Sequence, residues 1–154
     1  MKNIIIEKAT LKDIDFIIEG IKEICKIEKE PVDKKSELKK VITREIKEKE
    51  VFMAKLDGQV MGFLEVLFSK KEPYGINYGD EKKQYCWVNN MYVIKKFRKK
   101  GIGKLLFKKL EEICKKRKID KIMLDVFEVN FKAHKFYDKI GFESKIHIME
   151  KELK

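Results

Sequence analysis

One seven-residue segment constrains the fold of this chain more than any other. Arg98–Lys104 has the sequence Arg-Lys-Lys-Gly-Ile-Gly-Lys, and it joins a strand pattern that ends at Val93 to a helical pattern that begins at Gly101. The first turn of a helix carries unpaired backbone N–H groups and a partial positive charge, and glycine lets an anion approach the backbone closely. We therefore predict a strand–turn–helix unit with a phosphate-binding site at the turn.

The positive charge of the chain is concentrated around this turn. The formal net charge is +11, and residues 95–121 contain 13 Lys and Arg against 3 acids, a difference of +10. Such a segment attracts an anion, either the phosphates of a cofactor or those of a nucleic acid, although many of these lysines also suit a solvated helix face. The spacing matches neither a P-loop nor a Rossmann G-x-G-x-x-G after a first strand.

The rest of the chain alternates helical and strand patterns, and we predict the order β-α-α-β-β-β-α-β-α-β. The predicted elements are a strand at 4–7, a helix at 14–24 preceded by the capping-box pair Thr10 and Asp13, a helix at 38–46, strands at 51–56, 60–68 and 85–93, the helix at 101–117, a strand at 119–127, a helix at 130–139 and a final strand around Ile146 and Ile148. Asp57-Gly58 suits a tight hairpin turn, and residues 69–83 are predicted to form a long polar loop.

Length and composition favour one folded domain over residues 1–154. Hydrophobic residues make up 44% and charged residues 41% of the chain, with only 2 prolines, which is typical of a solvated globule rather than a disordered segment. The sequence contains no signal-peptide core and no apolar stretch long enough to span a bilayer. We therefore expect a soluble cytoplasmic protein without a membrane partner.

Cysteine and histidine form no metal-binding or nucleophilic pattern. Cys25, Cys86 and Cys114 are far apart and lie in apolar surroundings, which predicts reduced thiols in the core. The only histidines are His134 and His147, and neither has the spacing of a metal ligand. We expect no metal site.

The turn and the segment downstream of it resemble the acetyl-coenzyme A signature of the GNAT superfamily of N-acetyltransferases. Arg98 to Gly103 matches the pattern Q/R-x-x-G-x-G/A at a helix start. The downstream match comprises Leu124-Asp125-Val126, Asn130, Ala133, Phe136-Tyr137 and Gly141-Phe142. The order of elements agrees from Ile4 to about Met149. The resemblance implies an α/β (α+β) fold with a central mixed, mostly antiparallel sheet flanked by helices, in which parallel strands 4 and 5 splay apart.

The resemblance also implies where acetyl-coenzyme A would bind as co-substrate. Main-chain groups of Met91, Tyr92 and Val93 would pair with its pantetheine arm. The pyrophosphate would be wrapped by backbone amides of Arg98, Lys99, Lys100, Gly101, Ile102, Gly103 and Lys104. Asn130 would cap its helix and reach the pantetheine side, and Tyr137 would stand near the thioester sulfur. Met91 and Val93 also suit a core role, and Asn130 a simple helix cap.

The implied transfer needs a proton donor and a proton acceptor. An alkylamine with a pKa near 10.4 must lose a proton before attack, which costs about 5 kcal/mol at neutral pH without help, and the leaving thiolate gains from a phenol hydroxyl. Tyr137 suits the donor. We rank Asp125 first and Glu65 second as the base, although a solvated or ion-paired role suits each equally. Trp87 occupies the position of a strand glutamate in some histone-acetylating relatives, which argues against a histone substrate.

The predicted function is N-acetylation of a primary amine of a small molecule or peptide, by direct transfer without a covalent enzyme intermediate. The carboxylates available to a cationic amine are Glu28, Glu30, Glu72, Asp80 and Glu81. Two alternatives stay open, a non-catalytic acyl-coenzyme A sensor and a basic nucleic-acid-binding module. Phe97 and Phe107 argue against nucleic acid, because both belong to the apolar packing pattern and leave no exposed aromatics for base stacking. Whether the chain forms a homodimer is left open.

Overall fold

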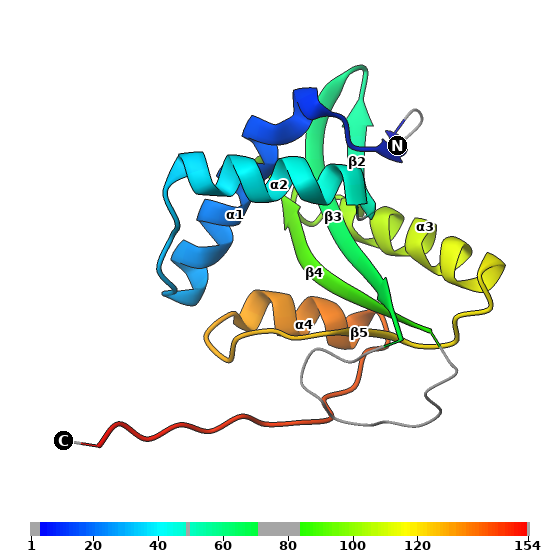
Figure 1. Ribbon diagram of the computed structural model, residues 1–154. Coiled ribbons are helices and arrows are strands. Elements are labelled where there is room, and N and C mark those ends of the chain that lie inside the picture. Colours follow the sequence, from blue (N-terminus) through cyan, green and yellow to red (C-terminus); the bar gives the residue numbers. More distant parts are fainter. Residues whose placement is uncertain (1–3, 49, 71–83, 154) are drawn as a thin grey trace.

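The computed structural model describes residues 4–48, 50–70 and 84–153. A five-stranded sheet forms its centre, and helices lie against both faces (Figure 1). The strands are β1 (Ile4–Lys8), β2 (Glu50–Leu56), β3 (Gln59–Ser69), β4 (Tyr85–Val93) and β5 (Ile122–Leu124). The helices are α1 (Ile14–Glu28), α2 (Lys35–Glu48), α3 (Ile102–Lys116) and α4 (Phe131–Lys139), with single 3-10 turns η1 (Leu11–Asp13) and η2 (Lys95–Phe97).

Strands that are neighbours in the chain are also neighbours in the sheet, in the order β1-β2-β3-β4-β5. The first four strands form antiparallel pairs, whereas β4 and β5 are parallel because α3 crosses over between them. The β2–β3 hairpin turns at Asp57 and Gly58, whose φ angles of +48° and +80° lie in the left-handed region that this turn needs. The mixed, mostly antiparallel sheet predicted from the sequence is confirmed.

The helices bury their apolar faces in two separate cores. On one face of the sheet, α1 and α2 bury Ile17, Ile18 and Ile42 almost completely. On the other face, Leu106 and Leu110 of α3 lie at the centre of the core. Full burial of a side chain of this size stabilises the fold by about 1.5–3 kcal/mol. The apolar spacing of each helix therefore decides which of its faces meets the sheet.

The capping box predicted before α1 is present. The backbone N–H of Thr10 donates to the Asp13 carboxylate at 2.8 Å, and Asp13 also pairs with Lys55 of β2 at 2.9 Å. Burial raises the pKa of Asp13, but the hydrogen bonds from Thr10 and Lys55 outweigh burial and leave this pKa below its usual value. The start of α1 is therefore fixed to the sheet by a charged contact.

Two predictions about strands near the C-terminus are wrong. The strand predicted at 119–127 is confined to Ile122–Leu124, and no strand forms around Ile146 and Ile148, because residues 142–153 have no regular structure. An alternating pattern specifies which face a strand would bury, but a strand forms only where a neighbouring backbone completes its hydrogen bonds. Among the described residues, β5 pairs only with β4. The segment around Ile146 and Ile148 therefore has no neighbouring strand that completes its backbone hydrogen bonds.

The long loop predicted at 69–83 lies mainly outside the described residues, since β3 continues to Ser69 and the description resumes at residue 84. None of the described helices is both long and apolar enough to cross a membrane.

Candidate active site

A gap opens in the sheet between β4 and β5. The last parallel pair is Val88↔Leu124, and β4 then continues without β5 to Val93. Along a strand, successive residues direct their N–H and C=O groups to opposite sides, so part of the backbone of residues 89–93 faces the gap. This stretch includes Met91–Val93, for which pantetheine contacts are predicted. The predicted splaying of the parallel pair is therefore present.

Glu65 of β3 holds a bulge in β4 at the start of this gap. Glu65 pairs with Asn90 while the next residue of β3 pairs with Val88, so Asn89 is the extra residue of the bulge. The Glu65 carboxylate, whose residue is 2% exposed, accepts hydrogen bonds from Nδ2 of Asn89 at 3.0 Å and of Asn90 at 2.8 Å. A bulge bends a strand and increases its twist. The bulge residue Asn89 comes directly after Val88, the last residue of β4 that pairs with β5.

The turn before α3 has backbone geometry suited to an anion. Lys99 and Gly101 adopt positive φ angles of +60° and +82°, and α3 begins at Ile102. No described side chain caps this helix end. The first N–H groups of α3 therefore remain available, and together with the helix dipole they fit a pyrophosphate. Glycine at Gly101 is required by its left-handed conformation.

The Arg98 side chain is engaged away from the turn. Its Nε donates to the carbonyl oxygen of Val93 at 2.8 Å, its guanidinium contacts the Glu23 carboxylate at 3.3 Å, and it lies 5.6 Å from the centre of the Tyr92 ring. The Tyr92 hydroxyl donates to the same Glu23 oxygen at 3.0 Å. The Arg98 side chain thus links α1 to the end of β4, which is a structural role.

Gly103 has a packing role that the sequence pattern did not reveal. A Cβ at this position would lie 2.9 Å from Cζ of Phe136 on α4, which is closer than two carbons in contact allow. The absence of a side chain at Gly103 lets α3 and α4 approach each other. Glycine is therefore needed here for helix packing as well as for the close approach of a phosphate.

Asn130 connects α4 to the end of α1. Its Oδ1 accepts a hydrogen bond from the N–H of Ala133 at 3.3 Å, and its Nδ2 donates to Oε1 of Glu28 at 3.1 Å. Glu28 is the last residue of α1, after which Lys29 turns the chain in a left-handed conformation. The predicted helix cap is confirmed. The link to Glu28, 102 residues away in sequence, carries no sequence signal.

Tyr137 lies buried on α4 beside two carboxylates. It is 9% exposed and packs among aromatic rings. These rings belong to Phe107, Phe136 and Phe142. Burial, followed by the negative charges of Glu28 and Asp125, raises the pKa of the Tyr137 hydroxyl above its usual value. The phenol is therefore protonated at neutral pH and suits a proton donor.

Glu28 and Asp125 are close enough to affect each other. Asp125 is exposed and directly follows the last residue of β5, where the pairing with β4 ends. Burial raises the pKa of Glu28, the hydrogen bond from Asn130 lowers it, and the charge of Asp125 raises it again, with a raised pKa as the net result. A cationic group between the two carboxylates would relieve this repulsion.

The two predicted bases, Asp125 and Glu65, lie in different surroundings. The negative charge of Asp125 contributes to the raised pKa of Tyr137, so Asp125 lies within electrostatic range of the predicted proton donor. Glu65 uses both carboxylate oxygens to hold the bulge. Side chains along β3 alternate between the two faces of the sheet. Phe63 lies in the core beneath α1 and α2, and Leu64 lies in the core beneath α3. Glu65 therefore points to the same face as Phe63, the face covered by α1 and α2. Asp125 is the better placed of the two.

The other predicted residues lie outside this group. Glu30 is exposed near the end of α1, and Glu72, Asp80 and Glu81 lie outside the described residues. All three cysteines are free, with Cys86 and Cys114 buried and Cys25 partly buried. Among the described residues, no three or more His, Cys, Asp or Glu side chains are grouped so that they could hold a metal ion.

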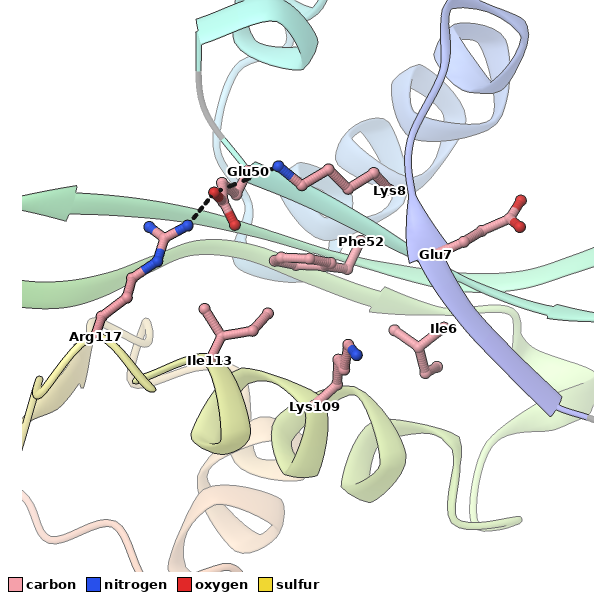
Figure 2. Close-up of a pocket in the computed structure, with 8 residues that line it drawn as sticks. All are labelled: Ile6, Glu7, Lys8, Glu50, Phe52, Lys109, Ile113 and Arg117. Carbon is pink, nitrogen blue, oxygen red and sulfur yellow. Dashed lines mark hydrogen bonds and ion pairs between the residues drawn. The ribbon is translucent and has the colours of Figure 1, made fainter. Parts of the chain in front are cut away.

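A separate surface pocket of about 370 Å³ lies between α3 and the strands β1 and β2 (Figure 2). Glu50 at its rim forms ion pairs with Arg117 and, at 3.4 Å, with Lys8. Phe52, Ile6 and Ile113 supply its apolar lining. The pocket contains none of the predicted site residues and is not part of the candidate site.

The separated parallel strands, the uncapped helix start and the buried phenol are the features expected of a coenzyme A site of the acyltransferase kind. Residues 18–142 match the Acetyltransferase (GNAT) family. The chain therefore belongs to this family, as its motifs predicted.

Several known proteins similar to this chain are named as acetyltransferases. Over 65 residues it is 31% identical to the probable spermine N(1)-acetyltransferase of Bacillus subtilis subsp. natto (strain BEST195), a match that spans 42% of this chain and 43% of that protein. A predicted acetyltransferase with acetyl-CoA from Clostridium acetobutylicum is 23% identical, with a TM-score of 0.75 over 97% of this chain and 96% of that one. Aminoglycoside antibiotic 6'-N-acetyltransferase AAC(6')-IG from Acinetobacter haemolyticus is 17% identical, with a TM-score of 0.75 over 97% and 99%. The two structures share the fold, and the curated relative is matched over less than half its length.

Proposed function

We propose that this GNAT family member transfers the acetyl group of acetyl-coenzyme A directly to a primary amine of a small molecule or peptide. The observation that carries the proposal is the buried Tyr137 hydroxyl, whose pKa is raised by burial and by the charges of Glu28 and Asp125, in a fold whose parallel pair β4–β5 ends at Val88 and Leu124. These groups would supply a proton donor and two carboxylates to an acetyl-coenzyme A molecule whose pantetheine arm binds along β4.

The chain offers two kinds of contact to acetyl-coenzyme A, which supplies the activated acetyl group when bound. Backbone groups of Met91–Val93 would pair with the pantetheine amides along the gap. Backbone N–H groups from Arg98 to Lys104, together with the helix dipole of α3, would hold the pyrophosphate. Lys99, Lys100 and Lys104 would add positive charge. The Arg98 side chain is instead hydrogen-bonded to Glu23 and to the carbonyl oxygen of Val93.

Tyr137 would act as the general acid. As the amine nitrogen forms its bond to the acetyl carbon, the carbon–sulfur bond breaks and the sulfur needs a proton. The raised pKa keeps the Tyr137 hydroxyl protonated at neutral pH, so the hydroxyl is available to donate a hydrogen bond or its proton to the departing thiolate. The amine nitrogen gives up one proton to the base. Each transfer therefore releases one proton from the amine and adds one proton to the sulfur.

Asp125 would be the base, with Glu65 as the second candidate. Its exposed carboxylate lies beside Tyr137, so it could take a proton from an incoming ammonium group directly or through one water. Glu65 is the weaker candidate because both of its oxygens accept amide hydrogen bonds.

We further propose that the acceptor is a cationic amine held by Glu28 and Asp125. Their mutual repulsion raises the pKa of Glu28, and an ammonium group between them would remove that cost. The partial match to a probable spermine N(1)-acetyltransferase and the shared fold with an aminoglycoside antibiotic 6'-N-acetyltransferase support amines that carry several positive charges.

The decisive experiment measures binding and turnover separately. Acetyl-coenzyme A should raise the melting temperature of the protein, and thiol release should then be followed with spermine, an aminoglycoside and a peptide with a free amino terminus. Thiol release that depends on one of these amines supports the proposal. Binding without turnover on any amine would favour a non-catalytic sensor, and indifference to acetyl-coenzyme A combined with salt-dependent binding to duplex DNA would favour a nucleic-acid module.

A further inference from the structure

One row of side chains on α3 lines the surface pocket between this helix and the edge of the sheet. Lys109, Ile113 and Arg117 follow one another at intervals of four residues, and residues at that spacing lie on one face of a helix. The backbone positions of this row span about 12 Å. The row therefore has a cation at each end and an apolar side chain in the middle.

The sheet supplies the opposite wall of the pocket. Ile6 and Lys8 are two residues apart in β1, and Glu50 and Phe52 are two apart in β2, so all four side chains face α3. Phe52 is 3% exposed, and Ile6 is partly buried. Together with Ile113, these two residues form an apolar floor.

The Glu50 carboxylate at one end of the pocket is already neutralised. It forms ion pairs with Arg117 and, at 3.4 Å, with Lys8. The Arg117 guanidinium also lies over the Phe68 ring, 4.1 Å from the centre of the ring, and this contact helps to hold it in place. Since Glu50 faces two cations, the charge at this end of the pocket remains positive.

Lys109 at the other end of the pocket has no such partner. No described residue forms an ion pair or a hydrogen bond with its ammonium group. The remaining carboxylate of the lining residues belongs to Glu7, which lies on the opposite face of β1 from Ile6 and pairs with Lys55 at 2.9 Å. Figure 2 shows the Glu7 side chain pointing away from Phe52. The Lys109 ammonium group is therefore available to an anion beside the apolar floor.

The features of this pocket define the chemistry of a ligand that would fit it. A volume of about 370 Å³ lies at the lower end of the range of small-molecule sites, so the ligand is small. The apolar floor favours an apolar body, and the excess of cations favours a negative charge. A carboxylate forms a stronger hydrogen bond with an ammonium group than a neutral acceptor does.

We propose that this pocket binds a small apolar carboxylate, whose charged group contacts Lys109 and whose body covers Ile6, Phe52 and Ile113. The pocket shares no residue with the proposed contacts to acetyl-coenzyme A or to the amine. This binding site therefore does not depend on the proposed acetyl transfer.

The first test is a titration of the full chain with cinnamate, followed through the backbone amide signals in NMR spectra with and without coenzyme A. Saturable shifts should occur in β1, β2 and the second half of α3 in both series, with a Kd of about 1 mM or tighter. Cinnamyl alcohol has the same body without the charge, and acetate has the charge without the body. Each should bind at least about tenfold more weakly. Shifts confined to residues 98–104, no saturation, or equal binding of cinnamyl alcohol would overturn the proposal.

The second test removes the proposed partner of the carboxylate. Lys109→Gln should weaken cinnamate binding by at least about fivefold, with little change in melting temperature because Lys109 is partly exposed. Lys108→Gln is the matched control, since it removes the same charge from an exposed neighbour on α3 that does not line the pocket. An undiminished affinity of Lys109→Gln, or an equal loss in both variants, would contradict the assigned contact.

Discussion

The side-chain amide of Asn130 joins the end of α1 to the start of α4 through a 3.1 Å hydrogen bond to Glu28. These two residues are 102 positions apart in the chain, so this one bond connects two helices that are remote in sequence. Asn130 also caps α4, so one side chain fixes both the helix that carries Tyr137 and the carboxylate beside Tyr137.

Replacing Asn130 should therefore remove both the cap of α4 and the hydrogen bond to Glu28. Asn130→Ala should lower the free energy of unfolding by about 1–3 kcal/mol, since a helix cap contributes about 1 kcal/mol and a hydrogen bond to a charged group about 1.5–3 kcal/mol. Urea denaturation checks this. Asn130→Ser is the control, because serine keeps a capping oxygen but is too short to donate to Glu28, so this variant should fall between the parent and Asn130→Ala. A loss below 0.5 kcal/mol for Asn130→Ala would show that the link carries no stability.

Tyr137→Phe should slow turnover by roughly one to three orders of magnitude. The substitution removes the proton donor but keeps the ring that packs with Phe107, Phe136 and Phe142. Acetyl-coenzyme A affinity and melting temperature should change little. Thiol-release kinetics and a thermal-shift titration measure the two effects, and a variant with the full rate would remove Tyr137 from the mechanism.

Glu28→Gln should stabilise the protein increasingly as pH rises. The pKa of Glu28 is raised in the folded state from 4.5, so the folded protein binds this proton more tightly than the unfolded chain does. The stability that Glu28 contributes is therefore present below about pH 4.5 and is lost as the pH rises through the folded-state pKa. The difference in unfolding free energy between Glu28→Gln and the parent should move in favour of the variant between about pH 4 and pH 7. Glu112→Gln, at an exposed position on α3, is the control, and a pH-independent difference for Glu28→Gln would contradict the raised pKa of Glu28.

Glu65→Gln distinguishes a base from a residue that holds the bulge. Gln offers one oxygen where Glu65 offers two, so the amide of Asn89 or Asn90 loses its acceptor at a cost of about 1–3 kcal/mol. We expect lower stability and weaker acetyl-coenzyme A binding, with the shape of the pH–rate profile unchanged. Asp125→Asn should instead alter the acidic limb of that profile with little effect on stability. The opposite pattern in the two variants would make Glu65 the base.

Gly103→Ala should destabilise the fold through Phe136. The added Cβ would lie 2.9 Å from the Phe136 ring, and overpacking of this kind costs about 1–3 kcal/mol. Phe136→Leu in the same chain should recover part of the loss. Gly101→Ala is the comparison, because its cost comes from the positive φ of +82° and Phe136→Leu should not relieve it. If both alanine variants respond alike, the contact with Phe136 does not decide the need for glycine at position 103.

Features determined by short stretches of sequence were predictable. The turn before α3 and the Asp57-Gly58 hairpin depend on glycine conformations that a few residues specify, and both are present. The helix ending at Lys116 follows from apolar spacing alone. The family motifs around Asn130 and Tyr137 also lie within one helix, so their neighbours in the chain identify them.

Features that depend on distant residues were not predictable. The bond from Asn130 to Glu28 and the clamp of Glu65 on Asn89 and Asn90 join separate elements through side chains whose meeting depends on the whole fold. The strand expected around Ile146 failed for a related reason, because its formation depends on a partner edge rather than on its own pattern.

The short parallel contact between β4 and β5 also affects how the protein folds and opens. β5 joins β4 through three residue pairs, whereas β3 and β4 share eight. The antiparallel strands close short loops and are expected to assemble first, while β5 and α4 dock only after α3 has formed. The same part should open first in native-state hydrogen exchange, without unfolding of the other four strands. A cofactor lodged between β4 and β5 would oppose that opening, so it should slow exchange most in the C-terminal third of the chain.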